Sequence, residues 1–308
     1  MTVLALDVGG TKLAAAIVDD DGTVLRRDRT ATVAADPWPS YAALLDRLVG
    51  DDPLDGVGIG CAGPMLWPVG EVSPLNVPAW RDFPLRATVT QRWPGIPVRL
   101  HNDAVAFAIG EHWKGAACHV DDMIGVVVST GVGGGIVLGG RVVDGASGNA
   151  GHIGHVVAEP DGPSCVCGGR GCLEAVARGP ATVAWARERG CSAKDGVALA
   201  RLAAGGDEVA LAALARSGRA VGTVLGSVAA LLDVRVVVIG GGLSESGPAL
   251  WEPLQEAFVR QAGLPYLAGA VVVPPALGGD ASLIGAAALV LAGDRYWSGD
   301  DGQSRLGR

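Results

Sequence analysis

The chain opens with two apolar runs that are separated by a glycine turn. Val3–Val8 and Leu13–Val18 flank Gly9-Gly10-Thr11, and short apolar runs bounded by turn residues predict strands. Asp20-Asp21-Gly22 is a hairpin signal before a further strand at Thr23–Arg27. We therefore expect strand, glycine turn, strand, tight turn and strand at the start of the chain.

The pattern of the first forty residues returns in outline near the middle of the chain. An apolar strand at 123–129 is followed by a second glycine turn at 130–135 and a short strand at 136–138. Between and after these segments, apolar and amphipathic runs predict the remaining elements. We expect helices at 40–49, 103–114, 173–189, 208–232, 248–261 and 281–291, strands at 56–60, 98–101, 234–239 and 270–273, and a loop at 62–84.

Two halves that each begin with strand, glycine turn and strand indicate a duplicated α/β unit with a cleft between the copies. Because each half begins with a hairpin, we expect mixed sheets rather than the parallel sheet of a dinucleotide-binding domain. Residues 293–308 are polar, and we expect this tail to fray.

Composition narrows the class of protein. Hydrophobic residues make up 49% and charged residues 18% of 308 residues, which is enough to bury a large core. The net charge of −8 and the absence of a basic run argue against nucleic acid as a partner. No signal peptide and no membrane-spanning run are visible, so we expect a cytoplasmic protein with cysteines that are reduced or metal-bound.

The glycine turns are candidate phosphate-binding loops, because glycine lets backbone N–H groups approach phosphate oxygens closely. A plain hairpin turn is the alternative for each loop taken alone. The spacing matches neither a Walker loop nor a Rossmann fingerprint. A third glycine cluster at 240–242 lies just before a helix, and three such clusters favour nucleotide binding. The predicted nucleotide-binding residues are Asp7, Gly9, Gly10, Thr11, Lys12, Thr130, Gly131, Gly241 and Gly242.

Asn102-Asp103 lies where an apolar strand passes into a helix. An acidic residue at this position is often only a helix cap. It is also a suitable base for phosphoryl transfer, which requires one oriented proton acceptor in addition to charge stabilisation. The positive end of the helix dipole would keep the Asp103 carboxylate ionised.

Four residues have the spacing of a zinc site. His155, Cys165, Cys167 and Cys172 form the pattern H-x9-C-x-C-x4-C in a Gly/Pro-rich segment. One imidazole and three thiolates make a complete tetrahedral set for structural Zn²⁺. The other cysteines are isolated, and we expect them to be small core residues; they are Cys61, Cys118 and Cys191.

Together these motifs resemble the ROK family of sugar kinases and repressors, from about Leu4 to Leu291. The resemblance implies an actin-like (ribonuclease H-like) fold, with residues 1–115 and the last helix, about 280–293, in one domain and 116–279 in the other, before a tail at 294–308. It also implies that both glycine loops bind ATP, that Asp103 is the base, and that Asp7 orients Mg²⁺ through water. Asn76, Asn102, His155 and Glu174 would bind the sugar, and the zinc loop would order that site.

One position departs from the common family pattern Ala-Gly-Glu-x-Gly-His. This chain has His152 where that Glu stands, and a neutral imidazole offers one donor and one acceptor but no charge. The resulting Gly-His-x-Gly-His is similar to that of bacterial N-acetylmannosamine kinases. A donor at this position could meet an N-acetyl carbonyl, so we predict that His152 contacts the substrate.

The sequence therefore predicts transfer of the γ-phosphate of ATP to the 6-hydroxyl of a hexose, with N-acetylmannosamine or a related N-acetylhexosamine preferred. A glucokinase is the alternative, and a sugar-responsive regulator without catalysis is a further one. A repressor of the same family would carry an N-terminal DNA-binding segment, whereas the first loop here begins at Asp7. We expect a homodimer or homotetramer, with no nucleic-acid or membrane partner. The sequence leaves open whether polyphosphate can also serve as donor.

Overall fold

The computed structural model describes residues 1–33, 35–75 and 77–299, and the chain forms two compact units. The first unit comprises residues 1–121, 135–151 and 276–308, and the second comprises 122–134 and 152–275. The domain boundaries expected from the sequence stay a prediction. No helix in the described part of the chain combines the length and the apolar character needed to cross a membrane.

The first unit contains a five-stranded mixed sheet with the order β3-β2-β1-β4-β7. Strand β1 pairs antiparallel with β2 and parallel with β4, so the mixed sheet expected from the opening hairpin is confirmed. The elements of this unit are β1 (Thr2–Val8), β2 (Lys12–Asp19), β3 (Val24–Ala31), α1 (Trp38–Val49), β4 (Gly56–Cys61), β5 (Met65–Leu66), β6 (Glu71–Val72), α2 (Leu85–Arg92), β7 (Val98–Asn102), α3 (Asp103–Trp113), β10 (Arg141–Val142), η4 (Gly278–Asp280), α9 (Ala281–Leu291) and α10 (Gly293–Tyr296).

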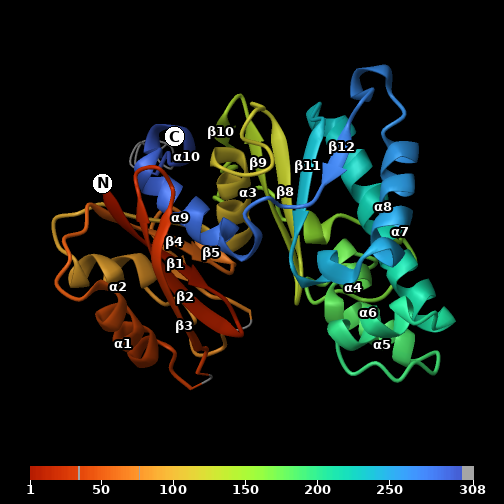
Figure 1. Cartoon of the computed structure of the whole chain (residues 1–308), viewed down its shortest axis with the longest axis horizontal. Helices are drawn as coiled ribbons and strands as arrows, with labels where there is room; N and C mark the ends of the chain where they lie inside the picture. Colours follow the sequence, from red (N-terminus) through yellow and green to blue (C-terminus); the bar gives the residue numbers. More distant parts are fainter. Residues whose placement is uncertain (34, 76, 300–308) are drawn as a thin grey trace. The chain divides into compact units, whose positions relative to one another are not determined.

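Both faces of this sheet are covered by helices, which explains why its inner strands β1, β2 and β4 are largely apolar and buried, whereas the edge strand β3 is charged and mostly exposed. Successive side chains of a strand point to opposite faces. Leu4 and Leu6 of β1 accordingly pack in the cluster formed with Tyr41 of α1, whereas Val3 and Ala5 pack in the cluster formed with α9. Helices α1 and α2 lie on one side of the sheet and α9 lies on the other (Figure 1).

Helix α9 crosses α3 at very short range. A Cβ atom added at Gly285 would lie 1.7 Å from the carbonyl oxygen of Ala106, so only glycine permits this approach. The crossing fixes the helix that begins at Asp103 against the sheet. It therefore holds the first turn of α3 in a defined place.

The second unit contains the glycine-rich and cysteine-rich segments. The second sheet has the order β10-β9-β8-β11-β12, and β9 (Val132–Leu138) spans the chain boundary between the units. The elements of the second unit are β8 (Met123–Val128), η1 (Ile153–His155), α4 (Leu173–Ala177), α5 (Gly179–Arg187), α6 (Gly196–Ala204), α7 (Glu208–Leu232), β11 (Val236–Gly240), η2 (Gly242–Ser246), α8 (Pro248–Gln261), η3 (Pro265–Leu267) and β12 (Val271–Val273).

Some expected elements need correction. The helix expected at 173–189 is two helices, α4 and α5, that break at Arg178. Arg178 is extended, with φ −61° and ψ 150°, and Pro180 starts the next helix within its first two positions, as proline does readily because it needs no backbone N–H there. Helices α2 and α6 and the β5/β6 hairpin were not expected from the sequence.

The tail was also expected to be frayed from residue 293, and this expectation is wrong for its first part. Gly293–Tyr296 forms α10, and Tyr296 is fully buried. The Tyr296 hydroxyl lies 2.6 Å from Nδ1 of His112 in α3. The buried Tyr296 ring and its hydrogen bond to His112 therefore hold this segment against the rest of the first unit. Residues 300–308 lie outside the described residues.

Candidate active site

The first glycine loop is a tight connection between β1 and β2. The Gly9 N–H donates to the Lys12 carbonyl at 3.1 Å, and the Thr32 hydroxyl donates to the Gly9 carbonyl at 2.8 Å. The turn expected from the sequence is thus confirmed, with Thr11 and Lys12 exposed at its end. Its nucleotide-binding role stays a prediction.

Asp7 and Asp103 influence one another electrostatically in the first unit. Burial is the main cause that raises the pKa of the Asp7 carboxyl to about 7, and the Asp103 charge raises it further against the opposing effect of Lys12. In the sheet, Asp7 of β1 pairs with Gly60 of β4, which pairs with His101 of β7. The carboxyl ends of these parallel strands therefore bring Asp7 and the Asn102-Asp103 turn to one edge of the sheet.

Asn102 is the N-cap of α3, and Asp103 is the first residue of the helix. Oδ1 of Asn102 accepts the Ala104 N–H at 3.0 Å, and Oδ1 of Asp103 accepts the same N–H at 2.8 Å. The capping role considered for Asp103 thus belongs mainly to Asn102. Asp103 remains only partly exposed at the positive end of α3.

The second glycine loop is joined to Glu174, which was predicted only as a sugar ligand. Oε2 of Glu174, in the first turn of α4, accepts the Val132 N–H at 2.9 Å. A Cβ atom at Gly131 would lie 2.9 Å from the same oxygen. Glu174 therefore positions the backbone that follows Thr130 and Gly131. Its predicted contact with the sugar would be an additional role.

A cavity of about 460 Å³ opens in the second unit beside this loop. Its lining combines the predicted Thr130 and Gly242 with residues that sequence reasoning missed, among them Gly179, Arg187 and Lys194. Gly241 does not line the cavity but fixes its wall, since a Cβ atom there would lie 2.5 Å from the Val128 carbonyl oxygen. The Gly179-Pro180 pair, which breaks the helical pattern, is the sequence feature that could have pointed to this part of the lining.

The four predicted zinc ligands come together in the second unit. One ligand atom from each of His155, Cys165, Cys167 and Cys172 lies within 4.8 Å of all the others. The Cys167 and Cys172 sulfurs are 3.7 Å apart, and the Cys165 sulfur is 3.8 Å from Nδ1 of His155. With Zn–S bonds of about 2.3 Å, the edge of a tetrahedron of sulfurs measures roughly 3.8 Å. The donor set therefore fits a tetrahedral zinc ion.

The isolated cysteines follow the sequence prediction only in part. Cys61 and Cys191 are buried, as expected, whereas Cys118 is exposed and is not a core residue. It lies after the end of α3, in the turn segment that leads to β8. No disulfide joins any of the six cysteines, all of which lie in the described part of the chain.

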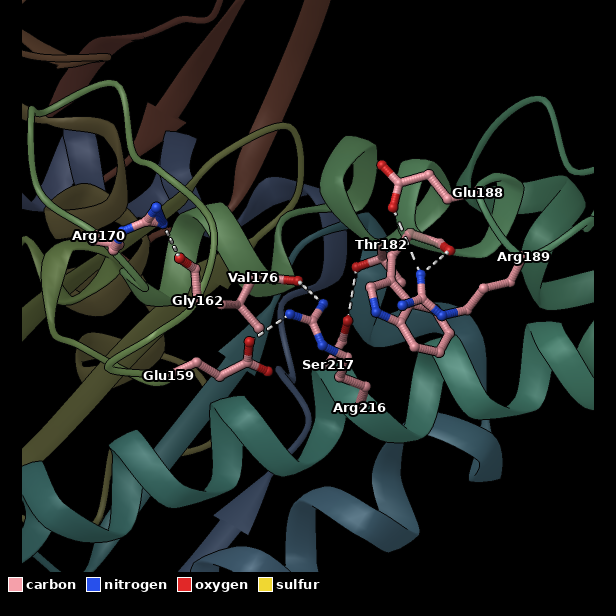
Figure 2. Close-up of polar contacts among 10 residues, drawn as sticks. Glu159, Gly162, Arg170, Val176, Thr182, Glu188, Arg189, Arg216 and Ser217 are labelled. Atoms are coloured by element: carbon pink, nitrogen blue, oxygen red, sulfur yellow. Dashed lines mark hydrogen bonds and ion pairs between the residues drawn. The ribbon is translucent and has the colours of Figure 1, made fainter.

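The segment that carries the cysteines is tied to the helices around it. Figure 2 shows the guanidinium of Arg216, from α7, between Glu159 and the carbonyl of Val176 in α4. Its distance to Oε2 of Glu159 is 2.6 Å. Arg170 donates to the Gly162 carbonyl at 2.8 Å within the segment itself (Figure 2). The cysteine segment is therefore held to α4, the helix of Glu174, by polar contacts.

The same region contains a second contact between helices. The hydroxyls of Thr182 in α5 and Ser217 in α7 are 2.8 Å apart in a buried position (Figure 2). The guanidinium of Arg189 lies 3.8 Å from the ring centroid of Trp185, within the range of a cation–π contact. The hydroxyl contact joins α5, which lines the cavity, to the long helix α7, whereas the Arg189–Trp185 contact lies at the end of α5 itself.

Of the remaining residues predicted to bind the sugar, His152 and His155 lie side by side. His152 directly precedes η1, and its ring is stacked on that of His155, with centroids 6.2 Å apart and planes 16° apart. Nδ1 of His155 faces the sulfurs, so the other ring nitrogen points away from the predicted metal. Asn76 lies outside the described residues.

Comparison with known proteins supports one family. The ROK family model matches residues 3–292. The N-acetylmannosamine kinase of Citrobacter koseri is 40% identical over 258 residues, covering 80% of this chain and 85% of that protein. A homologue of the same name from Escherichia fergusonii is 38% identical over 259 residues, covering 82% and 87%.

Solved structures give the same result. The ROK glucokinase of Streptomyces griseus, in complex with glucose and AMPPNP, is 32% identical with a TM-score of 0.82, covering 94% of this chain and 99% of that one. The ROK hexokinase of Thermus thermophilus is 38% identical with a TM-score of 0.81, covering 93% and 97%. These structures confirm the predicted actin-like fold class and, with the relatives above, the predicted class of enzyme, an ATP-dependent sugar kinase. The chain belongs to the ROK family.

Proposed function

We propose that this chain transfers the γ-phosphate of ATP to the 6-hydroxyl of an N-acetylhexosamine, with N-acetylmannosamine as the preferred substrate. The observation that carries the proposal is His152, stacked on His155 at 6.2 Å. An imidazole N–H can donate to an N-acetyl carbonyl, which a carboxylate cannot do. The identity of 40% to a relative named N-acetylmannosamine kinase supports the same substrate.

Asp103 is the proposed base. It would accept the proton of the attacking hydroxyl, which becomes a better nucleophile as its oxygen approaches the γ-phosphorus. Asn102 caps the helix through Oδ1, so its amide N–H₂ is the group left to meet a sugar oxygen. Asp7 would orient Mg²⁺, which neutralises phosphate charge when bound.

The cavity beside Thr130 and Gly242 is the proposed site of the nucleoside. Its volume of about 460 Å³ lies in the range of small-molecule sites. Lys194 and Arg187 line it beside Asp195, and their positive charge would favour ATP over an uncharged nucleoside. The N–H groups of the second glycine loop would approach the phosphates, with Glu174 fixing the loop at Val132.

Structural zinc is the proposed occupant of the four-residue cluster. His155, Cys165, Cys167 and Cys172 would hold it, and the metal would supply rigidity rather than chemistry. Coordination through Nδ1 of His155 fixes the ring, so that the other ring nitrogen can donate to a sugar hydroxyl. His152 would be oriented in turn by its stacking on His155.

Glucokinase is the second candidate. It is favoured by the solved relatives, which include a glucokinase that is 32% identical and a hexokinase that is 38% identical. In the common pattern a Glu stands at position 152, and a charged acceptor strengthens hydrogen bonds from sugar hydroxyls. The side chain at this position is therefore the place where the two candidates differ.

The test is a coupled ADP-release assay with glucose, mannose, N-acetylglucosamine and N-acetylmannosamine, followed by NMR of the product to identify the phosphorylated hydroxyl. We expect the highest kcat/KM with N-acetylmannosamine. In His152→Glu the preference should move toward glucose by about tenfold or more, as one hydrogen bond to a charged group can provide. Asp103→Asn is the control, and it should bind sugar with almost no turnover.

A preference for glucose in the wild-type enzyme would refute the substrate assignment but leave the kinase in place. Near-normal turnover by Asp103→Asn would refute the base assignment. Phosphorylation of a hydroxyl other than the sixth would refute the proposed position of transfer.

A further inference from the structure

His101 is a fully buried polar residue that the proposed reaction does not use. It is 0% exposed and immediately precedes Asn102 and Asp103, at the end of the edge strand β7. Sequence reasoning took it only as the last residue of an apolar strand. A buried imidazole requires partners for both ring nitrogens, and the partners here define its role.

The hydrogen bonds determine which nitrogen carries the proton. Nδ1 of His101 accepts the backbone N–H of Asn102 at 2.8 Å. A peptide N–H can only donate, so Nδ1 must carry a lone pair and the proton must reside on Nε2. Nε2 lies 3.0 Å from Oδ1 of Asp144. The imidazole is therefore neutral, with its Nε2–H donated to the Asp144 carboxylate.

Asp144 is itself fixed by the chain around it. Its other oxygen, Oδ2, accepts the Ser298 hydroxyl at 2.6 Å, and its carbonyl accepts the Ala150 N–H at 3.1 Å. The result is a chain of hydrogen bonds from Ser298 through Asp144 and His101 to the backbone of Asn102. All of these residues belong to the first unit.

Aromatic packing restricts the imidazole from the side. The ring of Trp67 lies 5.9 Å from that of His101, and Trp297 lies 5.6 Å from Trp67. Trp297 and Ser298 are neighbours in the segment after α10. The C-terminal segment thus reaches His101 both through a hydrogen bond to Asp144 and through a packed tryptophan.

We propose that His101 is a positioning residue for phosphoryl transfer. Its neutral imidazole, held in the Nε2-protonated form by Asp144, accepts the Asn102 N–H and so fixes the strand-to-helix turn that presents Asp103. The inference rests on the proposed role of Asp103. Because β7 is an edge strand, this turn has a neighbouring strand on one side only, and the hydrogen bond from the Asn102 N–H to His101 is a further restraint on it.

The test compares two amide variants of similar polarity. The Oδ1 of an asparagine at position 101 can accept the next backbone N–H, as Asp28 does from Arg29 at 2.8 Å and Asp103 does from Ala104. A glutamine extends its amide toward Asp144 and leaves the Asn102 N–H without this acceptor. His101→Phe removes both hydrogen bonds but keeps a ring against Trp67.

We expect His101→Gln and His101→Phe to lower kcat by about thirtyfold or more, since a misplacement of about 1 Å can cost a hundredfold. His101→Asn should stay within about threefold of the wild type. The KM for ATP should change less than about twofold in all three variants, because the proposed nucleotide residues in the second unit are untouched. Equal losses in the Asn and Gln variants, or a wild-type kcat in His101→Phe, would overturn the inference.

A spectroscopic measurement separates this inference from the proposed function. Long-range ¹H–¹⁵N correlation spectra of histidine-labelled enzyme should contain one neutral, Nε2-protonated imidazole that disappears in His101→Phe. If the signal that disappears in His101→Phe were instead that of an Nδ1-protonated imidazole, the inference would be overturned even if the kinase were fully active. If the wild type phosphorylated no sugar, the proposed function would fail, while the spectrum would still decide the hydrogen-bond arrangement.

Discussion

Asp7 is the residue at which pH should act most directly. Its folded pKa of about 7 lies above the model-peptide value of 3.8, so the folded state holds a proton that the unfolded state has released. This contribution to stability is fully present below pH 4 and is lost as the pH rises through about 7. Asp7 keeps part of its surface in contact with solvent, so about 2 to 3 kcal/mol between pH 5 and pH 8 is an upper limit.

Urea unfolding without Mg²⁺ or nucleotide should therefore show that the wild type loses more free energy of unfolding between pH 5 and pH 8 than Asp7→Asn does. Asp103→Asn should have an intermediate dependence, because it removes the Asp103 charge, which raises the Asp7 pKa, but leaves the larger effect of burial. The same pH dependence in the wild type and in Asp7→Asn would contradict this account.

Functional residues that belong to a recognisable local sequence pattern could be predicted from the sequence. Residues whose role depends on a contact with a distant part of the chain could not. Asn102-Asp103 stands out because it follows an apolar strand. The spacing of the cysteines is almost enough by itself to predict the four-residue cluster. His101 and Arg216 give no such signal. Their roles depend on Asp144 and Glu159, which are 43 and 57 residues away in the chain, and no local pattern specifies those contacts.

At the scale of elements, the cysteine segment should depend on its metal. The segment has little regular structure, and at Gly171 a Cβ atom would lie 1.5 Å from the Glu159 carbonyl oxygen. Such a tight loop is held together by its ligands. We expect about one zinc per chain in the wild type and little in Cys167→Ser, with a loss of roughly 2 to 3 kcal/mol, or about 5 to 10 °C in Tm.

Cys118→Ser is the matched control, because Cys118 and Cys167 are both exposed and only Cys167 belongs to the cluster. It should keep its zinc and the wild-type Tm. Metal content is measured by elemental analysis and Tm by scanning calorimetry. Zinc retained at wild-type levels in Cys167→Ser would contradict the ligand assignment.

The elements themselves were predicted best where one local property dominated. The opening hairpin follows from its glycines, and α7 follows from its long amphipathic pattern. The helix expected at 173–189 failed because the Gly179-Pro180 pair interrupts a continuous helical pattern. The tail failed because a polar composition says nothing of Tyr296, whose burial depends on His112 of a distant helix.

At the scale of the whole molecule, the first unit is assembled from separate stretches of chain, and Glu111 holds two of them together. This buried carboxylate in α3 accepts the N–H groups of Ala276 and Leu277 at 3.0 Å each, at the point where the chain re-enters the first unit. It also accepts the Ala116 N–H at 2.8 Å. A charged acceptor with several N–H donors is worth more than neutral hydrogen bonds.

Glu111→Gln should therefore destabilise the protein strongly, although it changes the side chain by a single group. The glutamine N–H₂ must face at least one of the donors that the carboxylate now satisfies, so a buried N–H loses its partner. We expect a loss of about 2 to 3 kcal/mol in the free energy of unfolding, measured by urea denaturation. Glu256→Gln, an exposed position on α8, should change it by less than about 0.5 kcal/mol. Equal stability of the two variants would contradict this prediction. It would mean that packing of α9, and not Glu111, holds the segment at 276–277 against the first unit.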